Sequence, residues 1–168
     1  YLLDMRTGTT QVAPLLYINN SNFVNYFVNG SDVISGITTI TASTWHHIAI
    51  SKSSGVSETK LFVNGVLQGT YSDSNTYTEK PIRIGARFDG LFGFYGYIDS
   101  LRVSKGITRY NSTFTPQSGF RANDGYNVLL LRFNGLSGSS IIVDEAYGTA
   151  VSPNDIYTLS GVTAGPGS

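Results

Sequence analysis

The sequence contains no cysteine, which excludes disulfides and thiolate metal sites. Charge is sparse: 13% of the 168 residues are charged, and 11 Lys and Arg balance 11 Asp and Glu. A formal net charge of zero gives no general attraction to phosphate backbones or anionic membranes. No apolar run approaches the roughly 20 residues that a membrane-spanning helix needs. Neither nucleic acid nor membrane is therefore expected as a partner.

Helix-forming patterns are also missing from the chain. No window shows sustained 3.6-residue periodicity with capping residues, and blocks rich in Ala, Leu, Glu and Lys do not occur. What the chain has instead is 19 Gly, 11 Tyr and 9 Phe among many Val, Ile, Thr and Ser residues. Because β-branched and aromatic residues favour strands, the composition predicts an all-β fold with almost no helix.

Short apolar segments alternate with turn signals, which recur about every ten residues, as in a β-sandwich or barrel. Two Asn-Gly pairs, at 29–30 and 64–65, supply the positive-φ residues of tight hairpins. Connections this short leave no room for crossover helices, so the sheets should be antiparallel. The segments expected to form strands are 14–18, 23–28, 33–40, 44–52, 60–72, 81–87 and 96–104.

The segment "GYIDSLRVS" at 96–104 does not alternate cleanly, because Ile98 is out of phase with Leu101 and Val103. Either a β-bulge changes the phase of this strand, or both of its faces are partly buried. The second alternative places Asp99 within the strand, where it would make local hydrogen bonds.

Two longer stretches carry an ordered set of motifs: "TWHHIAISKSSGVSETKLFVNGVLQG" and "PIRIGARFDGLFGFYGYIDSLRVSKGITRYNSTFTP". Their order resembles the concanavalin A-like lectin/glucanase superfamily, specifically the laminin-G-like domains common in bacteriophage tail fibres and other virion proteins. The resemblance covers roughly residues 1–117. It implies an antiparallel jelly-roll β-sandwich, with two sheets packed face to face.

The resemblance also bears on domain organisation. In this family a segment like "RYNSTFTP" closes a domain, whereas a segment like "NVLLLRF" belongs near a domain's start, yet here it follows at 127–133. We therefore assign 1–120 to one laminin-G-like sandwich that lacks its first strands. Residues 121–168 are either the opening strands of a second repeat, or the closing strand of the first sandwich followed by a tail.

His46 and His47 are neighbours on an expected strand, so they point to opposite faces and do not chelate one metal ion. His47 shares a face with Trp45 and matches the histidine of the family. We interpret His47 as a residue packed in the core between the sheets, not as a metal ligand. We likewise interpret Trp45 as a core residue, not as a ring on which a sugar stacks.

Glycoside hydrolysis needs two carboxylates at a fixed separation, and the glucanases of the superfamily place theirs as Glu-x-Asp-x-x-Glu. Glu58, Glu79 and Glu145 lie outside any such motif, so we expect no enzyme and no catalytic residues. Many laminin-G-like domains bind Ca²⁺ through Asp carboxylates. Asp73 and Asp89 lie in expected loops, as calcium ligands or as ordinary turn residues.

The segment "ARFDGLFGFYG" at 86–96 is the most site-like part of the chain. An exposed ring could stack on the apolar face of a sugar, with Arg87 and Asp89 hydrogen-bonded to its hydroxyls. The alternative is that the rings pack under the loop or against a neighbouring subunit. The candidate ligand-binding residues are Arg87, Phe88, Asp89, Phe92 and Tyr95.

The segment that follows is interpreted as scaffold, with Arg109, Tyr110 and Phe114 attaching the closing loop to a sheet. The resemblance then implies a non-enzymatic structural and binding module of a virion appendage or surface, such as a tail fibre or a capsid decoration. Its partners would be a surface glycan or other virion proteins, and its location the virion or an extracellular surface. A homotrimer is compatible with this role. A bacterial cell-surface adhesin and a glycan hydrolase are the alternatives.

Overall fold

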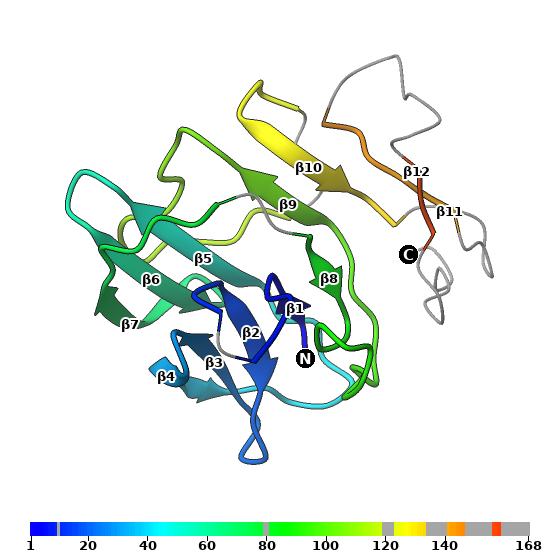
Figure 1. Ribbon diagram of the computed structural model, residues 1–168, viewed down its shortest axis with the longest axis horizontal. Coiled ribbons are helices and arrows are strands. Elements are labelled where there is room, and N and C mark those ends of the chain that lie inside the picture. The colour runs from blue at the N-terminus through cyan, green and yellow to red at the C-terminus, as the bar shows by residue number, and fades with distance from the viewer. Residues whose placement is uncertain (10, 79–80, 119–122, 134–140, 147–155, 159–168) are drawn as a thin grey trace. The chain divides into compact units, whose positions relative to one another are not determined.

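The computed structural model describes residues 1–9, 11–78, 81–118, 123–133, 141–146 and 156–158 (Figure 1). These residues form twelve strands and no helix, which confirms the all-β prediction. No helix long and apolar enough to cross a membrane occurs among them. The chain divides into two compact units, and each is described by itself. The first unit comprises Tyr1–Phe94 with Thr108–Gln117, and the second comprises Tyr95–Ile107 with Ser118–Ser168.

The first unit contains two antiparallel sheets, as predicted. The larger has the strand order β4-β3-β2-β1-β8, where the strands are β1 (Leu3–Asp4), β2 (Leu15–Ile18), β3 (Phe23–Val28), β4 (Ser31–Thr39) and β8 (Arg83–Ile84). The smaller has the order β5-β6-β7, where the strands are β5 (Ile48–Ser53), β6 (Glu58–Val63) and β7 (Val66–Ser72).

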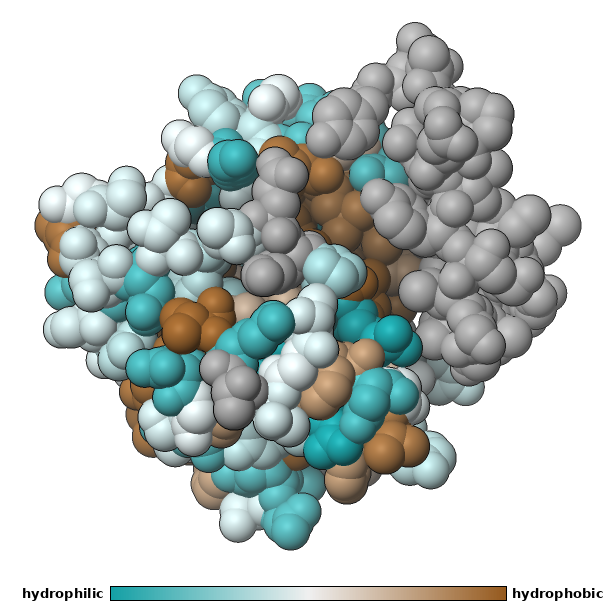
Figure 2. All heavy atoms as spheres, in the orientation of Figure 1, coloured by the Kyte–Doolittle hydropathy of each residue, from teal (hydrophilic) through white to brown (hydrophobic). Residues whose placement is uncertain are grey.

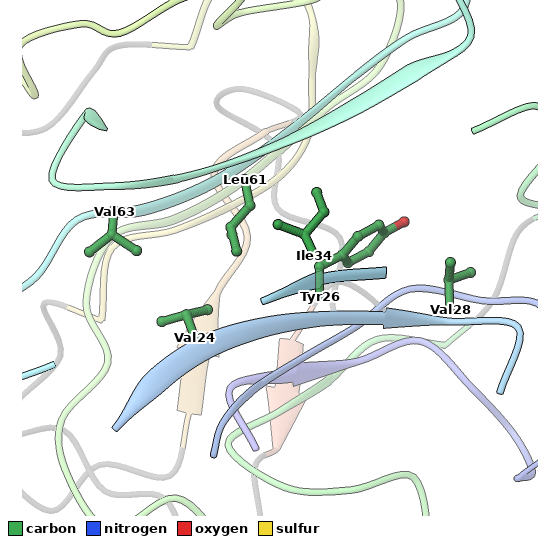
Figure 3. Close-up of a cluster of buried hydrophobic side chains, with 6 residues drawn as sticks. All are labelled: Val24, Tyr26, Val28, Ile34, Leu61 and Val63. Atoms are coloured by element: carbon green, nitrogen blue, oxygen red, sulfur yellow. The ribbon is translucent and has the colours of Figure 1, made fainter. Parts of the chain in front are cut away.

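The core of the first unit lies between these sheets. Successive residues of a strand point to opposite faces, so β3 directs Val24, Tyr26 and Val28 to one side. Figure 3 shows these three side chains pointing toward Leu61 and Val63 of β6. All five are at most 1% exposed. This two-sheet packing confirms the β-sandwich expected from the sequence.

Both Asn-Gly pairs form the tight turns that the sequence predicts. Asn29 and Gly30 have φ angles of 52° and 85°, and they connect β3 to β4. Asn64 and Gly65 have φ angles of 51° and 78°, and they connect β6 to β7. Positive φ at both central residues is the signature of a type I′ turn, which matches the twist of a two-stranded ribbon.

One side chain links the edges of the two sheets. Gln68 of β7 is buried, and its Oε1 accepts hydrogen bonds from the backbone N–H groups of Ile37 at 2.9 Å and Thr38 at 2.8 Å. Both residues belong to β4, the outermost strand of the five-stranded sheet. The amide of Gln68 therefore satisfies part of an edge that would otherwise remain open.

The outer face of the three-stranded sheet is covered by the closing segment, residues 108–117. Phe62 points away from the core and is nevertheless 0% exposed. The rings of Tyr110 and Phe114 stack at a centroid distance of 3.8 Å, and Phe114 lies 5.4 Å from Phe62. The N–H of Phe114 donates to the carbonyl of Gly65 at 3.0 Å. The scaffold interpretation of Tyr110 and Phe114 is thus confirmed.

Trp45 is not in the core. It is 68% exposed and lies in the connection between β4 and β5, because β5 begins only at Ile48. His47 is half-buried and packs edge-on against Tyr110 at 6.1 Å and Phe114 at 5.5 Å, outside the layer between the sheets. The core assignment of both residues was wrong, since the alternation in 44–47 falls in a loop.

In the second unit, β9 (Leu101–Ser104) pairs antiparallel with β10 (Asn127–Leu131). Asp99 lies before β9 and is exposed, so its placement within a strand was wrong. Ser100 has a φ of 54°, and this residue separates Ile98 from the strand. The mixed phase of the sequence therefore reflects a late strand start.

Residues 127–131 of the segment "NVLLLRF" form β10. Leu129, Leu130 and Leu131 are each at most 8% exposed. An isolated bridge joins Leu131 to Asp144, and β11 (Ile141–Val143) pairs with β12 (Ile156–Thr158). Whether these strands open a second repeat or complete the first sandwich stays a prediction.

Candidate functional site

The loop that follows β8 is held by its own backbone. Arg87 N–H donates to the carbonyl of Leu91 at 2.9 Å, and Phe94 N–H donates to the carbonyl of Gly85 at 2.7 Å. Gly90 N–H closes the tip by donating to the carbonyl of Arg87 at 2.8 Å. Residues 85–94 therefore form a small hairpin that holds its side chains in fixed directions.

Arg87 organises the side chains of this hairpin. Its guanidinium lies 4.5 Å from the ring centroid of Phe92 and 5.5 Å from that of Phe88, within the range of cation–π attraction. It also forms an ion pair with Asp89, with Nε 3.0 Å from Oδ1. Hydrogen bonds from Arg87, helped by the N–H of Leu91, lower the pKa of Asp89 to about 2. Arg87 and Asp89 are thus bonded to each other.

Phe92 carries the exposed ring of the hairpin. It is 60% exposed, and its backbone adopts a φ of 53°, which is uncommon for a residue of this size. Its ring lies 5.8 Å from the ring of Tyr1, which stacks in turn on Tyr17 at 5.6 Å. We call Tyr17, Tyr1 and Phe92 the aromatic row. Because each ring supports the next, the exposed member has little rotational freedom left to lose on binding.

A buried ion pair fixes the hairpin to the five-stranded sheet. Arg6 makes a bidentate pair with Asp4, with Nε–Oδ1 and Nη2–Oδ2 distances of 2.9 Å each. Its guanidinium lies between the rings of Phe27 and Phe88, at 5.3 and 5.4 Å from their centroids. Asp4 Oδ2 also accepts the N–H of Phe88 at 3.0 Å. Burial opposes ionisation, but the hydrogen bonds and the charge of Arg6 keep the pKa of Asp4 below its usual value.

Polar side chains continue from the aromatic row onto the outer face of β3 and β4. Asp32 Oδ2 accepts hydrogen bonds from the hydroxyl of Tyr17 at 2.7 Å and from Asn25 Nδ2 at 2.9 Å. Asn25 is 3% exposed, and its Oδ1 accepts from Asn19 at 3.2 Å. Burial, with the carboxylate of Asp32, raises the pKa of Tyr17 to about 12. Asp32 itself is exposed and oriented by these donors, so it presents a fixed hydrogen-bond acceptor beside the rings.

A family model described as the concanavalin A-like lectin/glucanases superfamily, of laminin G type, matches residues 3–109. The chain belongs to this superfamily. No curated protein and no solved structure matches the chain. A laminin-G-like domain is a carbohydrate- or protein-binding module, so its exposed side chains are the place to look for contacts with a partner.

The laminin-G-like fold brings together four of the five candidate residues. Arg87, Asp89 and Phe92 share the hairpin surface, whereas Phe88 is half-buried over Arg6 and contributes to the scaffold. Tyr95 is 100% exposed and belongs to the second unit.

Sequence reasoning missed the residues that extend this surface beyond the hairpin. Strand pairing brings Tyr1 next to Phe92 of the hairpin. It also brings Tyr17 next to both Tyr1 and Asp32. A signal existed for Asn25, because alternation in "FVNYFV" places it on the face opposite Val24. A buried amide on the outer face of β3 needs hydrogen-bond partners, so it indicates a polar network there.

Asp73, one of the two residues considered for calcium, lies in a network of hydrogen-bond donors. Its Oδ2 accepts from the hydroxyls of Thr59 at 2.6 Å and Tyr77 at 2.8 Å, and its Oδ1 accepts from Asn75 Nδ2 at 2.9 Å. The ammonium of Lys52 lies 3.2 Å from Oδ1. Burial disfavours the charge, but these hydrogen bonds still lower the pKa of Asp73 below its usual value.

Such an environment suits a carboxylate and does not suit a cation. Calcium needs oxygen acceptors, whereas the neighbours of Asp73 are donors and an ammonium group, and those of Asp89 include a guanidinium. A calcium ion at either carboxylate would first have to displace these partners. Among the residues that the structure describes, no cluster of three or more His, Asp or Glu side chains could hold a metal ion.

Proposed function

We propose that the chain is a non-enzymatic binding module of a virion appendage or surface, which contacts glycans or other virion proteins through the aromatic row. One observation carries this proposal. The ring of Phe92 is 60% exposed, although Arg87 on one side and Tyr1 on the other fix its position. An exposed ring that the fold also immobilises is expected where a partner is bound.

The chemistry of the surface supports either partner class. An aromatic ring offers an apolar face to the C–H face of a sugar or to an apolar side chain of a protein. Next to the row, Asp32 provides an oriented acceptor for a hydroxyl or amide donor. The surface is small, so each contact would be weak, and several copies on one appendage would multiply the affinity. A homotrimer would supply such multivalency.

The charge states of the carboxylates support a non-enzymatic role. A glycosidase needs a carboxylic acid whose pKa is raised so that it can protonate the leaving group. The carboxylates whose pKa is shifted among the described residues, Asp4, Asp73 and Asp89, are all shifted downward by neighbouring donors and cations. Each is paired with a basic residue, which leaves it poorly suited to donate a proton.

The virion setting rests on the resemblance to laminin-G-like domains of bacteriophage tail fibres. A bacterial cell-surface adhesin would use the same surface, so the binding experiment does not separate the two. The location of the protein distinguishes them, because a virion protein co-purifies with virus particles, whereas an adhesin stays with the cell that makes it.

Binding can be tested with the chain presented as a trimer. The trimer is applied to a glycan array and, separately, to the proteins of purified virus particles. Phe92→Ala should abolish the signal, whereas Trp45→Ala, which removes another exposed ring, should leave it intact. Equal binding by both variants would show that the aromatic row is not the contact surface. Release of reducing sugar from a polysaccharide would contradict the non-enzymatic assignment.

A further inference from the structure

Asn-Gly pairs occur three times in the sequence, at 29–30, 64–65 and 134–135. The third lies outside the described residues. The first two form the same type of turn, with φ angles that differ by at most 7° at corresponding positions. Both asparagine side chains are exposed. Sequence and turn type therefore give no reason for the two pairs to react differently.

An Asn-Gly pair can rearrange without an enzyme, because glycine has no Cβ to shield its backbone nitrogen. That nitrogen attacks Cγ of the asparagine side chain, a C–N bond forms, and the side-chain amide leaves as ammonia. The product is a cyclic succinimide, in which all atoms of the two residues except the lost ammonia remain. Water then opens the ring at either carbonyl and gives aspartate or isoaspartate. Water is the only co-reactant.

The surrounding structure restrains Asn64 against this reaction. Its Oδ1 accepts the N–H of His47 at 2.9 Å, and its Nδ2 donates to Nδ1 of His46 at 3.1 Å. The glycine is held as well, since the carbonyl of Gly65 accepts the N–H of Phe114 at 3.0 Å. A Cβ at Gly65 would lie 1.8 Å from the carbonyl oxygen of Phe114, which shows how closely the closing segment covers it. Attack would require these hydrogen bonds to break.

Asn29 has none of these restraints. The structure gives its side chain no hydrogen-bond partner among the described residues, and nothing lies within 4 Å of a Cβ built on Gly30. We propose that Asn29 is a site of spontaneous deamidation, and that the fold protects Asn64 from the same reaction.

The modification would change the surface next to the candidate site. It replaces a neutral amide by a carboxylate three residues before Asp32, and it changes the formal net charge of the chain from zero to minus one. The isoaspartyl product also adds a backbone carbon to a turn that joins β3 to β4. The chain would therefore carry a time-dependent negative charge at this edge of the five-stranded sheet.

The experiment is to incubate the whole folded chain at mildly alkaline pH and to follow each Asn-Gly pair by peptide mass spectrometry. Cleavage after Lys and Arg places the three pairs in different peptides. Asn29 should react faster than Asn64 by about tenfold or more, because opening of a hydrogen-bonded turn limits the second reaction. In denaturant, the two should react at similar rates. Equal rates in the folded chain, or an unreactive Asn29 while the unfolded chain deamidates, would overturn the proposal.

A variant locates the source of the protection. His46→Ala removes the acceptor of Asn64 Nδ2 and should accelerate deamidation at Asn64 without changing the rate at Asn29. Far-ultraviolet circular dichroism, which reports the strands, would verify that the fold is retained. An unchanged Asn64 rate in the folded variant would contradict the role assigned to this hydrogen bond. Asn29→Gln should remove the acidic species that peptide mass spectrometry assigns to Asn29.

Discussion

Gly65→Ala should destabilise the first unit far more than Gly30→Ala, although both glycines occupy the same position of a type I′ turn. A left-handed backbone costs an alanine about 1–2 kcal/mol, and that cost applies to both variants. Replacing glycine also reduces the entropy of the unfolded chain, again in both. Gly30 has nothing within 4 Å of the added Cβ, so about 1–2 kcal/mol is its whole penalty.

At Gly65 the added Cβ meets backbone. It would lie 1.8 Å from the carbonyl oxygen of Phe114, whereas ordinary contact begins at 3.4 Å. The closing segment must therefore shift, which breaks the Phe114–Gly65 hydrogen bond, worth about 1 kcal/mol. The shift also disturbs the packing of Phe114 on Phe62, and such ring pairs contribute about 0.5–1.5 kcal/mol. With the backbone cost, the total is about 2.5–4.5 kcal/mol.

Thermal unfolding followed by far-ultraviolet circular dichroism, which reports the loss of the strands, measures this difference. The melting temperature should fall by about 10 °C for Gly65→Ala and by about half of that or less for Gly30→Ala. In a Phe114→Ala background the excess cost at Gly65 should shrink, since the closing segment is already loosened. Equal destabilisation by the two glycine variants would refute the reasoning that the closing segment rests on this turn.

Four further results are expected. Asp73→Asn should cost about 3 kcal/mol in urea unfolding, because Lys52 keeps its charge and loses its buried partner. Acid should destabilise the fold as the pH drops below 3.8. Hydrogen-bond donors hold the pKa values of Asp4 and Asp73 in the folded chain below that reference value, so the unfolded chain takes up protons first. A free energy of unfolding that stays constant down to about pH 2 would contradict this. Trp45→Ala should change stability by less than about 0.5 kcal/mol, and a larger loss would return this side chain to the core. A calcium chelator should leave the melting temperature unchanged if Asp73 and Asp89 keep their present partners.

Local chemistry explains which parts of the fold were predictable. Asn-Gly turns at 29–30 and 64–65 depend only on the φ angles of two neighbouring residues, so the sequence specifies them directly. The strand expected at 23–28 forms β3, and its side chains Val24, Tyr26 and Val28 enter the core. Trp45 shows where that logic ends. Alternation continues through 44–47, but Ser43 has a φ of 58° and β5 starts only at Ile48, so alternating residues there lie in a loop.

The candidate site divides in the same way. Arg87 and Asp89 are two residues apart and pair within one turn, and the composition of 86–96 marked this segment as the most site-like part of the chain. The aromatic row could not be predicted, because it depends on strand register. Leu3 pairs with Leu16 on one side and with Ile84 on the other, and this double pairing brings the start of β1 next to the loop after β8. A shift of one residue in either pairing would move these side chains to the opposite face.

The outer faces of the two sheets of the first unit differ in how they are covered, and this difference bears on the proposed binding surface. The closing segment covers the three-stranded sheet so fully that Phe62 has no exposed area. Among the described residues of the first unit, Phe88 packs on Arg6 over the outer face of the five-stranded sheet, whereas Phe92 and Asp32 are exposed. Figure 2 shows apolar residues, drawn brown, at the surface among hydrophilic ones. An apolar ring in such a setting is costly to keep exposed unless a partner covers it, whereas its fixed geometry lowers the entropy lost when the partner binds. At Phe92, the proposed partner would therefore contact a ring that the core of the first unit does not bury.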